Sequence, residues 1–248
     1  MSEGRVAIIG DSWTSMNRLK PSLVDNSALE LNPHTGSNIE VSNYSLGSLT
    51  WSKLLKDQGR LKKWALSYPR VTLVHLGGVE LANGQIIKGN EKTPIGRFVG
   101  ESIENNILTL ISKAATYQDE ARNQEWIKEK IIVLVAIPDW HNFKGHPQSL
   151  PADQVRSLRR KINLQLSRLM VTLWRVHRVI LVKPHINHPR IIGVHLHPED
   201  QAIYNDQLME VVKKSLCRHC KLENYEPKKN LMNLKLVQCP RQPVNQNN

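Results

Sequence analysis

The sequence predicts an α/β protein, built as a three-layer α/β/α sandwich around a five-stranded parallel sheet. Two observations favour this fold class. Five short β-branched or aliphatic runs are apolar throughout instead of alternating with polar residues, which is typical of strands that are buried on both faces of a parallel sheet. Longer stretches of helical periodicity separate these runs, and strands that alternate with helices indicate βαβ crossovers.

The expected strands are short apolar runs that are spread over most of the chain. In chain order they are Arg5 to Ile9, Ile39 to Tyr44, Val71 to Leu76, Ile131 to Ile137 and Val179 to Val182. Each run has the length of an ordinary strand and is too short for an ordinary helix. We therefore expect these five runs to form the central sheet.

The expected helices lie between and after these runs. In chain order they are Leu49 to Leu66, Ile103 to Ala115, a stretch that begins at Pro151, and Pro198 to Leu216. Their apolar residues recur at spacings of three and four, which places them on one face of a helix. Pro151 is a favoured first-turn residue, and Asp153 adds early negative charge against the helix dipole.

Length and composition indicate one folded domain with a tail. The 248 residues are 40% hydrophobic and 23% charged, which excludes disorder throughout the chain. We expect a domain over residues 1–222 and a basic, largely disordered tail over residues 223–248, which are rich in Asn, Gln, Lys and Pro. The odd number of three cysteines favours a reducing compartment. The first apolar run is too short for a signal peptide or a membrane span, so we expect an intracellular protein, cytoplasmic or nuclear.

The charge of the chain is strongly positive and concentrated. Lys and Arg total 34 against 22 acidic residues, a formal net charge of +12. The segment from Arg156 to Arg190 holds nine basic residues and no Asp or Glu. Such a field attracts phosphates, anionic lipids or acidic proteins. The alternative interpretation is an ordinary solvated helix face.

Segments with glycine and polar residues follow the first, third and last expected strands. Gly10-Asp11-Ser12-Trp13 ends the first strand, and Gly77-Gly78-Val79-Glu80 follows the third. The segment Ile192-Gly193-Val194-His195-Leu196-His197-Pro198-Glu199 follows the last strand. Open α/β sheets build their sites at the carboxyl ends of their strands. We therefore expect these three segments to converge on one rim of the sheet.

In these motifs and in the order of its elements, the chain resembles the SGNH (GDSL-type) hydrolases, a flavodoxin-like superfamily of esterases, lipases and acetylhydrolases. The resemblance covers roughly residues 4 to 216. It implies that Ser12 is the nucleophile and His195 the general base. It also implies an oxyanion hole formed by the backbone N–H of Ser12 and by the turn at Gly47 or Ser48, within the segment Asn43 to Thr50.

Two positions depart from the family pattern. Val79 stands where the family has an asparagine that completes the oxyanion hole, and Ile192 stands where it has the aspartate that orients the histidine. Loss of the orienting carboxylate in a serine triad lowers the rate by about 10⁴, and loss of one side-chain oxyanion donor lowers it by about 10² to 10³. The sequence therefore predicts at most a weak serine esterase with a Ser12–His195 dyad.

The alternative is an inactive SGNH-like domain that binds RNA or another polyanion. The OSK domain of the germ-plasm protein Oskar, to which the chain has a distant resemblance in fold and degeneracy, is an SGNH-like domain that has lost catalytic residues and binds RNA. Here the candidate phosphate contacts lie on the basic helix. They are Arg156, Arg159, Arg160, Lys161 and Arg168. Because aromatic residues make up only 5% of the chain, we expect contacts to the nucleic-acid backbone to dominate over base stacking.

Metal binding is a weaker hypothesis. His195 and His197 have a spacing that can chelate a metal, and His141, His146, His185 and His188 lie near the same rim. No carboxylate or cysteine completes a known ligand spacing there, and the cysteines at 217 and 220 lack a second paired half. We therefore expect no metal and no cofactor. The expected partners are a small ester substrate or, in the alternative, RNA or another polyanion, and the sequence leaves the oligomeric state open.

Overall fold

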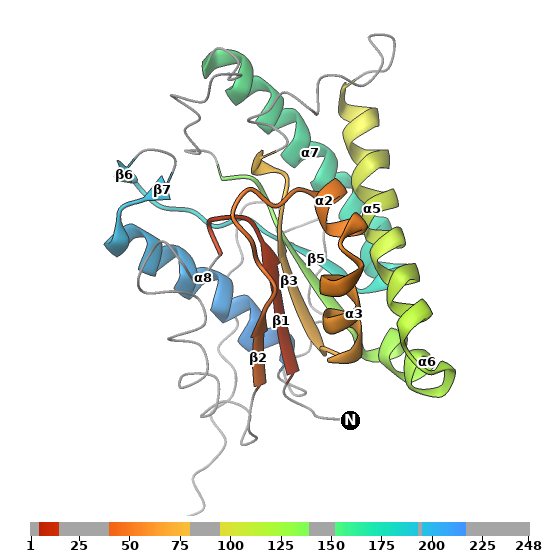
Figure 1. Ribbon diagram of the computed structural model, residues 1–248. Coiled ribbons are helices and arrows are strands. Elements are labelled where there is room, and N and C mark those ends of the chain that lie inside the picture. The colour runs from red at the N-terminus through yellow and green to blue at the C-terminus, as the bar shows by residue number, and fades with distance from the viewer. Residues whose placement is uncertain (1–4, 15–39, 80–94, 139–151, 193–194, 217–248) are drawn as a thin grey trace, which may run out of the picture.

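The computed structural model describes residues 5–14, 40–79, 95–138, 152–192 and 195–216 of the chain (Figure 1). Its centre is a five-stranded parallel sheet in the order β2-β1-β3-β4-β5. The strands are β1 (Arg5–Gly10), β2 (Glu40–Asn43), β3 (Val71–His75), β4 (Ile131–Val135) and β5 (Val179–Val182). The predicted fold class and all five predicted strands are confirmed, β5 with the predicted bounds.

The described helices cover both faces of the sheet, so that the molecule has three layers (Figure 1). They are α2 (Trp51–Lys56), α3 (Gln58–Leu66), α5 (Ile95–Tyr117), α6 (Glu120–Glu129), α7 (Ala152–His177) and α8 (Pro198–Leu216). The helices α2, α3, α5 and α7 pack on one face, and α8 packs on the other. Within the described ranges, no helix is long and apolar enough to cross a membrane.

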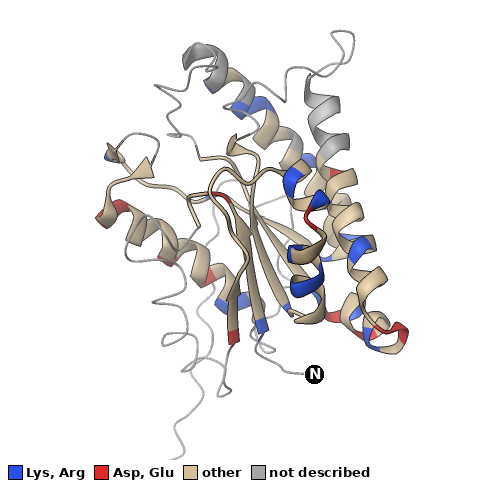
Figure 2. Ribbon diagram, viewed as in Figure 1, with Lys and Arg blue, Asp and Glu red and all other residues tan. Residues whose placement is uncertain are grey.

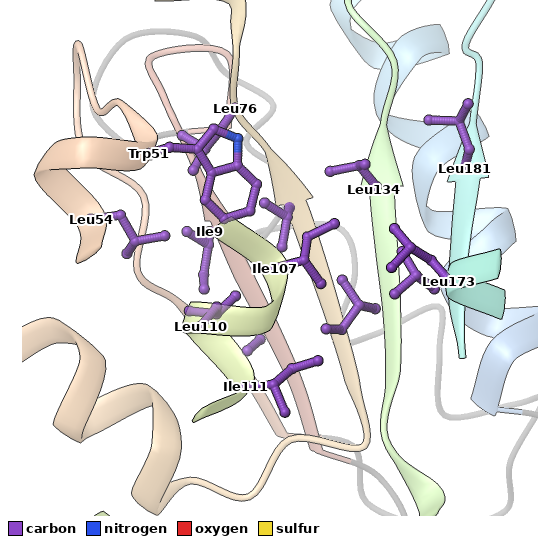
Figure 3. Packing of buried hydrophobic residues seen from close by; sticks show 14 of the residues in the cluster. Ile9, Trp51, Leu54, Leu76, Ile107, Leu110, Ile111, Leu134, Leu173 and Leu181 are labelled. Carbon is purple, nitrogen blue, oxygen red and sulfur yellow. The ribbon is translucent and has the colours of Figure 1, made fainter. Parts of the chain in front are cut away.

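Successive residues of β1, β4 and β5 alternate between two apolar clusters. In β1, Ile9 packs into the cluster that includes Ile107 and Leu110 of α5, whereas Ile8 packs into the cluster under α8. Figure 3 shows the first cluster, with the α5 side chains directed at the sheet. Because both faces of the sheet are covered, β4 and β5 need no polar face, which explains their continuous apolar sequences. Strand β2, at one edge of the sheet, differs: its sequence is Glu-Val-Ser-Asn, and its residues are exposed or half-buried.

Four features differ from the sequence expectations. The expected helix Leu49 to Leu66 is two helices, because Asp57 leaves the helical conformation and its side chain accepts a hydrogen bond from the Arg60 N–H at 2.9 Å. The helix expected over Ile103 to Ala115 extends beyond both predicted ends and forms α5, Ile95–Tyr117. Helix α6 was not expected. A short antiparallel hairpin, β6 (Ile191–Ile192) and β7 (His195–Leu196), was not expected either. The expected tail, residues 223–248, lies outside the described residues.

Candidate active site

The turn that carries Ser12 is folded tightly against β3. The Asp11 N–H donates to the His75 carbonyl at 3.3 Å, and the Trp13 N–H donates to Asp11 Oδ1 at 3.0 Å. A Cβ atom at Gly10 would overlap the Thr14 hydroxyl and crowd the His75 backbone. Glycine is therefore required where β1 enters the turn, and the turn holds Ser12 at the carboxyl end of the strand.

His195 reaches Ser12 from the other end of the chain. It lies on β7, where it pairs with Ile192 of β6, and its Nε2 atom is 2.9 Å from Ser12 Oγ. This separation is a hydrogen-bond distance between a hydroxyl and a ring nitrogen that can accept its proton. The structure thus brings together the two residues that the sequence motifs single out.

An ionic clamp ties the β6–β7 hairpin to α8. The Arg190 guanidinium lies 2.6 Å from Asp200 Oδ1 and 2.7 Å from Glu199 Oε2, and the Arg190 N–H donates to Asp200 Oδ2 at 2.6 Å. The His197 N–H donates to the Arg190 carbonyl at 2.8 Å. The arginine holds the pKa of the Asp200 carboxyl below its usual range. The clamp therefore fixes both sides of the hairpin that presents His195.

The loop that follows β2 lies beside the Ser12 turn. The Leu46 N–H donates to the Gly10 carbonyl at 3.0 Å, and the Ser45 and Thr14 hydroxyls are 2.8 Å apart. The next residues are Gly47 and Ser48, and Ser48 has a φ of 58°, a conformation that is uncommon for residues other than glycine and is concentrated at functional sites. In the described part of the chain, the N–H groups of Ser12, Gly47 and Ser48 donate to no other group.

Val79 and Ile192, which depart from the family pattern, place apolar side chains where the family has polar ones. Val79 is half-buried in a helical segment that begins after β3, two residues from Gly77, whose φ of 112° suits only glycine. Ile192 is 59% exposed on the outer strand of the hairpin. Neither side chain can donate to an oxyanion or accept a proton from His195.

Below the Ser12 turn lies a buried polar cluster that the sequence analysis did not identify. His75 at the end of β3 places Nε2 at 2.6 Å from the Tyr204 hydroxyl of α8, and its Nδ1 at 3.7 Å from Asp11 Oδ1. The Trp13 indole packs against both His75 and Tyr204. Burial raises the pKa of Asp11 and also that of Tyr204. The sequence feature that could have indicated this cluster is the histidine at the end of β3, a strand whose other residues are apolar except Thr72.

The basic helix presents most of its predicted contact residues to solvent, with one correction. Arg156, Arg160, Lys161 and Arg168 are exposed on α7, but Arg159 is only 5% exposed. Residue 159 lies three and seven positions before Ile162 and Leu166, which places it on the buried arc of the helix. Arg159 therefore does not belong to the exposed basic face.

Further basic residues lie in the same layer of the molecule as α7. Figure 2 shows Lys and Arg on α2 and α3 as well as on α7. Those of α2 and α3 are Lys53, Lys56, Arg60, Lys62 and Lys63. Helix α8, on the opposite face of the sheet, carries four acidic residues and two lysines. The described surface is therefore more basic on the α7 side of the sheet than on the α8 side.

The histidines at this rim do not form a metal site with other described residues. Among the described residues, no group of three or more His, Cys, Asp or Glu side chains could hold a metal ion. His141, His146 and the three cysteines lie outside the described residues.

Comparison with solved structures identifies the fold. The chain matches TesA with a TM-score of 0.53 at 16% identity, over 85% of this chain and 99% of that one. It matches the psychrotrophic esterase EstA from Pseudoalteromonas sp. with a TM-score of 0.51 at 15% identity, over 86% and 98% of the two chains. A GDSL-like lipase from Bacteroides thetaiotaomicron matches with a TM-score of 0.52 at 13% identity, over 86% and 89%. The chain has the fold of the GDSL-type (SGNH) hydrolases.

Sequence comparison adds nothing to this result. No family model matches the chain, and no curated protein matches it. At identities of 13 to 16%, the likeness to the solved structures establishes the SGNH fold alone. Function has to be argued from the site.

Proposed function

We propose that this SGNH-fold protein is a weak serine ester hydrolase that uses a Ser12–His195 dyad. The observation that carries the proposal is the distance of 2.9 Å between His195 Nε2 and Ser12 Oγ. Sequence motifs alone do not require such a contact, because Ser12 and His195 are 183 positions apart. The esterase named among the structural neighbours, EstA, is consistent with this chemistry.

The reaction follows from the positions of the side chains. Ser12 Oγ attacks the ester carbonyl carbon while its proton passes to His195 Nε2. The carbonyl oxygen becomes an oxyanion that accepts hydrogen bonds from the N–H groups of Ser12 and of the Gly47–Ser48 turn. The His195 imidazolium then protonates the leaving alcohol. A water molecule then attacks the acyl carbon while His195 Nε2 takes its proton, and the imidazolium returns that proton to Ser12 Oγ as the carboxylic acid leaves.

The proposed rate is low because two groups are missing. Val79 contributes no side-chain donor to the oxyanion, and Ile192 contributes no carboxylate to His195. Each loss alone lowers kcat by about 10² or more in serine hydrolases. The two losses are not additive within one catalytic unit. We therefore expect turnover of activated short-chain esters well below that of a complete triad.

Covalent labelling tests this proposal independently of a low turnover rate. The EstA structure is that of the esterase inhibited by monoethylphosphonate. An activated ethylphosphonate ester is therefore a suitable probe for this chain. We expect mass spectrometry to locate the phosphonyl group on Ser12, and the Ser12→Ala variant to lose both labelling and hydrolysis of p-nitrophenyl acetate. Ser52→Ala, which alters an exposed serine of α2, serves as the control. Hydrolysis that survives in Ser12→Ala would overturn the proposal.

The exposed basic face favours RNA binding as a second candidate function. Its core is formed by Arg156, Arg160, Lys161 and Arg168 of α7, and no acidic residue lies between positions 156 and 190. These side chains are solvent-exposed and can approach a phosphate backbone. None of these side chains takes part in the Ser12–His195 contact, so the two candidate functions do not exclude each other.

A further inference from the structure

Three side chains form a buried line behind the Ser12 turn. The Tyr204 hydroxyl lies 2.6 Å from His75 Nε2, and His75 Nδ1 lies 3.7 Å from Asp11 Oδ1. The Trp13 N–H donates to the same carboxyl oxygen at 3.0 Å. All three side chains are buried, and Asp11 is only 1% exposed. A carboxyl group in such a place needs partners if it is to be charged.

Tyr204 can set the order of donors and acceptors along this line. Burial and the charge of Asp11 raise the pKa of Tyr204 well above its ordinary value, so its hydroxyl keeps its proton and can donate to His75 Nε2. A neutral imidazole that accepts at Nε2 carries its own proton at Nδ1. That N–H faces Asp11. With this tautomer of His75, the line runs from Tyr204 through His75 to Asp11, and each donor is directed toward the carboxylate.

Asp11 is also close to the proposed catalytic pair. It precedes Ser12, whose hydroxyl contacts His195. The Trp13 indole lies against both imidazoles, with ring centroids 6.1 Å from His75 and 6.2 Å from His195. Positive charge on His195 lowers the pKa of Asp11, and by linkage the Asp11 carboxylate stabilises the His195 imidazolium to the same extent. A charge acts over a longer range in a buried site than in water.

We propose that Asp11 supplies the negative charge that stabilises the His195 imidazolium in this chain, where Ile192 replaces the orienting aspartate. His75 and Tyr204 are positioning residues, because they keep Asp11 ionised in its buried site. This inference rests on the proposed hydrolase function. Asp11 would be a charged partner of the Ser12–His195 dyad. It differs in sequence position from the family aspartate, which corresponds to Ile192, and it acts on His195 through its charge and not through a direct hydrogen bond.

Among the described residues, the titratable groups around Asp11 come from three elements. They are His75 at the end of β3, His195 on β7 and Tyr204 on α8. Burial of Asp11 raises its pKa, while His75, the Trp13 N–H and His195 oppose this rise. Whether Asp11 is ionised therefore depends on how far these groups offset the desolvation of its carboxyl group.

The test measures the pKa of His195 by NMR, in a Ser12→Ala background that needs no turnover. Asp11→Asn keeps an oxygen that can accept from the Trp13 N–H, removes the negative charge and replaces the second oxygen by an NH2 group. We expect it to lower the pKa of His195 by about half a unit or more, because an opposite charge favours the imidazolium. Asp206→Asn, which removes an exposed carboxylate of α8, should leave this pKa unchanged.

A second pair of variants distinguishes loss of the Asp11 charge from damage to the fold as the cause of a changed His195 pKa. Tyr204→Phe removes one hydroxyl, lets His75 change tautomer and should lower the pKa of His195 in the same direction. Ile192→Asp, added to Asp11→Asn, should restore the pKa of His195 and, in the Ser12 chain, restore kcat more than KM. An unchanged His195 pKa in folded Asp11→Asn and Tyr204→Phe variants would overturn this inference even if Ser12-dependent hydrolysis is normal. Absence of hydrolysis with a shifted pKa would overturn only the proposed function.

Discussion

Ile192 and His195 face each other across the β6–β7 hairpin as a pair in its antiparallel register. Position 192 is where the family resemblance places the orienting aspartate, so the backbone still presents that position to the histidine. The Ile192 side chain is 59% exposed. An aspartate there would keep much of its hydration, and the large penalty of a buried unpaired carboxylate would not apply.

Repair of the site is therefore the first prediction. We expect Ile192→Asp to raise kcat for p-nitrophenyl acetate, because a carboxylate fixes the imidazole tautomer and stabilises the imidazolium. Val79→Asn should add to this gain by supplying an oxyanion donor, with a combined increase of about 10² or more. Ile192→Asn is the uncharged control. A stable Ile192→Asp/Val79→Asn protein with no gain in kcat would show that the remaining geometry is not productive.

The second prediction concerns Lys130 and the pH dependence of stability. The Lys130 side chain lies against the Trp126 ring and donates to the Ile127 and His177 carbonyls at 3.3 and 3.5 Å. Burial, and secondarily the charge of Arg178, lower its pKa to about 8. Between pH 8 and the ordinary lysine pKa, the unfolded chain binds more protons than the folded one at this residue. This group therefore makes the free energy of unfolding rise with pH in that window.

Urea denaturation at several pH values between 7 and 10 measures this effect. The difference in free energy of unfolding between the wild-type chain and Lys130→Met isolates the lysine from other titrating groups. We expect this difference to move in favour of the wild type as the pH rises. Lys128→Met, which alters an exposed lysine of α6, should show no such trend. Parallel curves for wild type and Lys130→Met would contradict the prediction.

The strands and the main helices could be predicted because burial leaves a direct trace in their sequences. Both faces of the sheet are covered, so β3 and β4 are apolar at every position but Thr72 and His75. Helix α8 begins at Pro198 as expected, since proline suits a first turn. Helix α6 left no such trace, because only Asn123 and Trp126 of its ten residues are buried. The two-residue strands β6 and β7 are too short for any periodicity.

The site was only partly predictable for a similar reason. Ser12 and His195 stand in short motifs, so a family resemblance points to them. His75 and Tyr204 are 129 positions apart, and each alone resembles a polar residue tolerated in a core. Their contact arises only when α8 packs on the sheet. Arg159 was misassigned because its charge suggested a surface position, whereas its spacing from Ile162 and Leu166 places it on the buried arc.

The third prediction concerns the clamp at Arg190. Arg190→Gln removes the contacts to Glu199 and Asp200 that tie the hairpin to α8. We expect faster amide hydrogen exchange at His195 and Leu196 and a lower kcat, because His195 is held less firmly beside Ser12. Arg122→Gln, which removes an exposed ion pair with Asp119, is the control. Exchange at His195 that does not change in Arg190→Gln would show that the clamp is dispensable.

The last prediction separates RNA binding from a merely solvated basic face. If Arg156, Arg160 and Lys161 contact phosphates, the chain should bind single-stranded RNA with an affinity that falls steeply with salt, with a log–log slope of about −0.7 per neutralised phosphate. These side chains are exposed on α7, so changing all three to Glu should leave the apolar face of the helix intact. We expect the triple variant to weaken binding of every RNA sequence tested and to change Tm little.

The matched comparison controls for net charge alone. Arg156→Glu with Arg160→Glu changes the charge by the same amount as Arg122→Glu with Lys128→Glu on α6, whose other charged side chains are three glutamates. Fluorescence anisotropy with a labelled RNA should show a large loss of affinity for the α7 pair and a small loss for the α6 pair, since only the first is expected to contact phosphate. Equal losses would mean that the protein responds to overall charge. Absence of RNA binding at low salt would mean that the α7 face is an ordinary solvated surface. Ester hydrolysis by the Ser12–His195 dyad would then be the remaining candidate function.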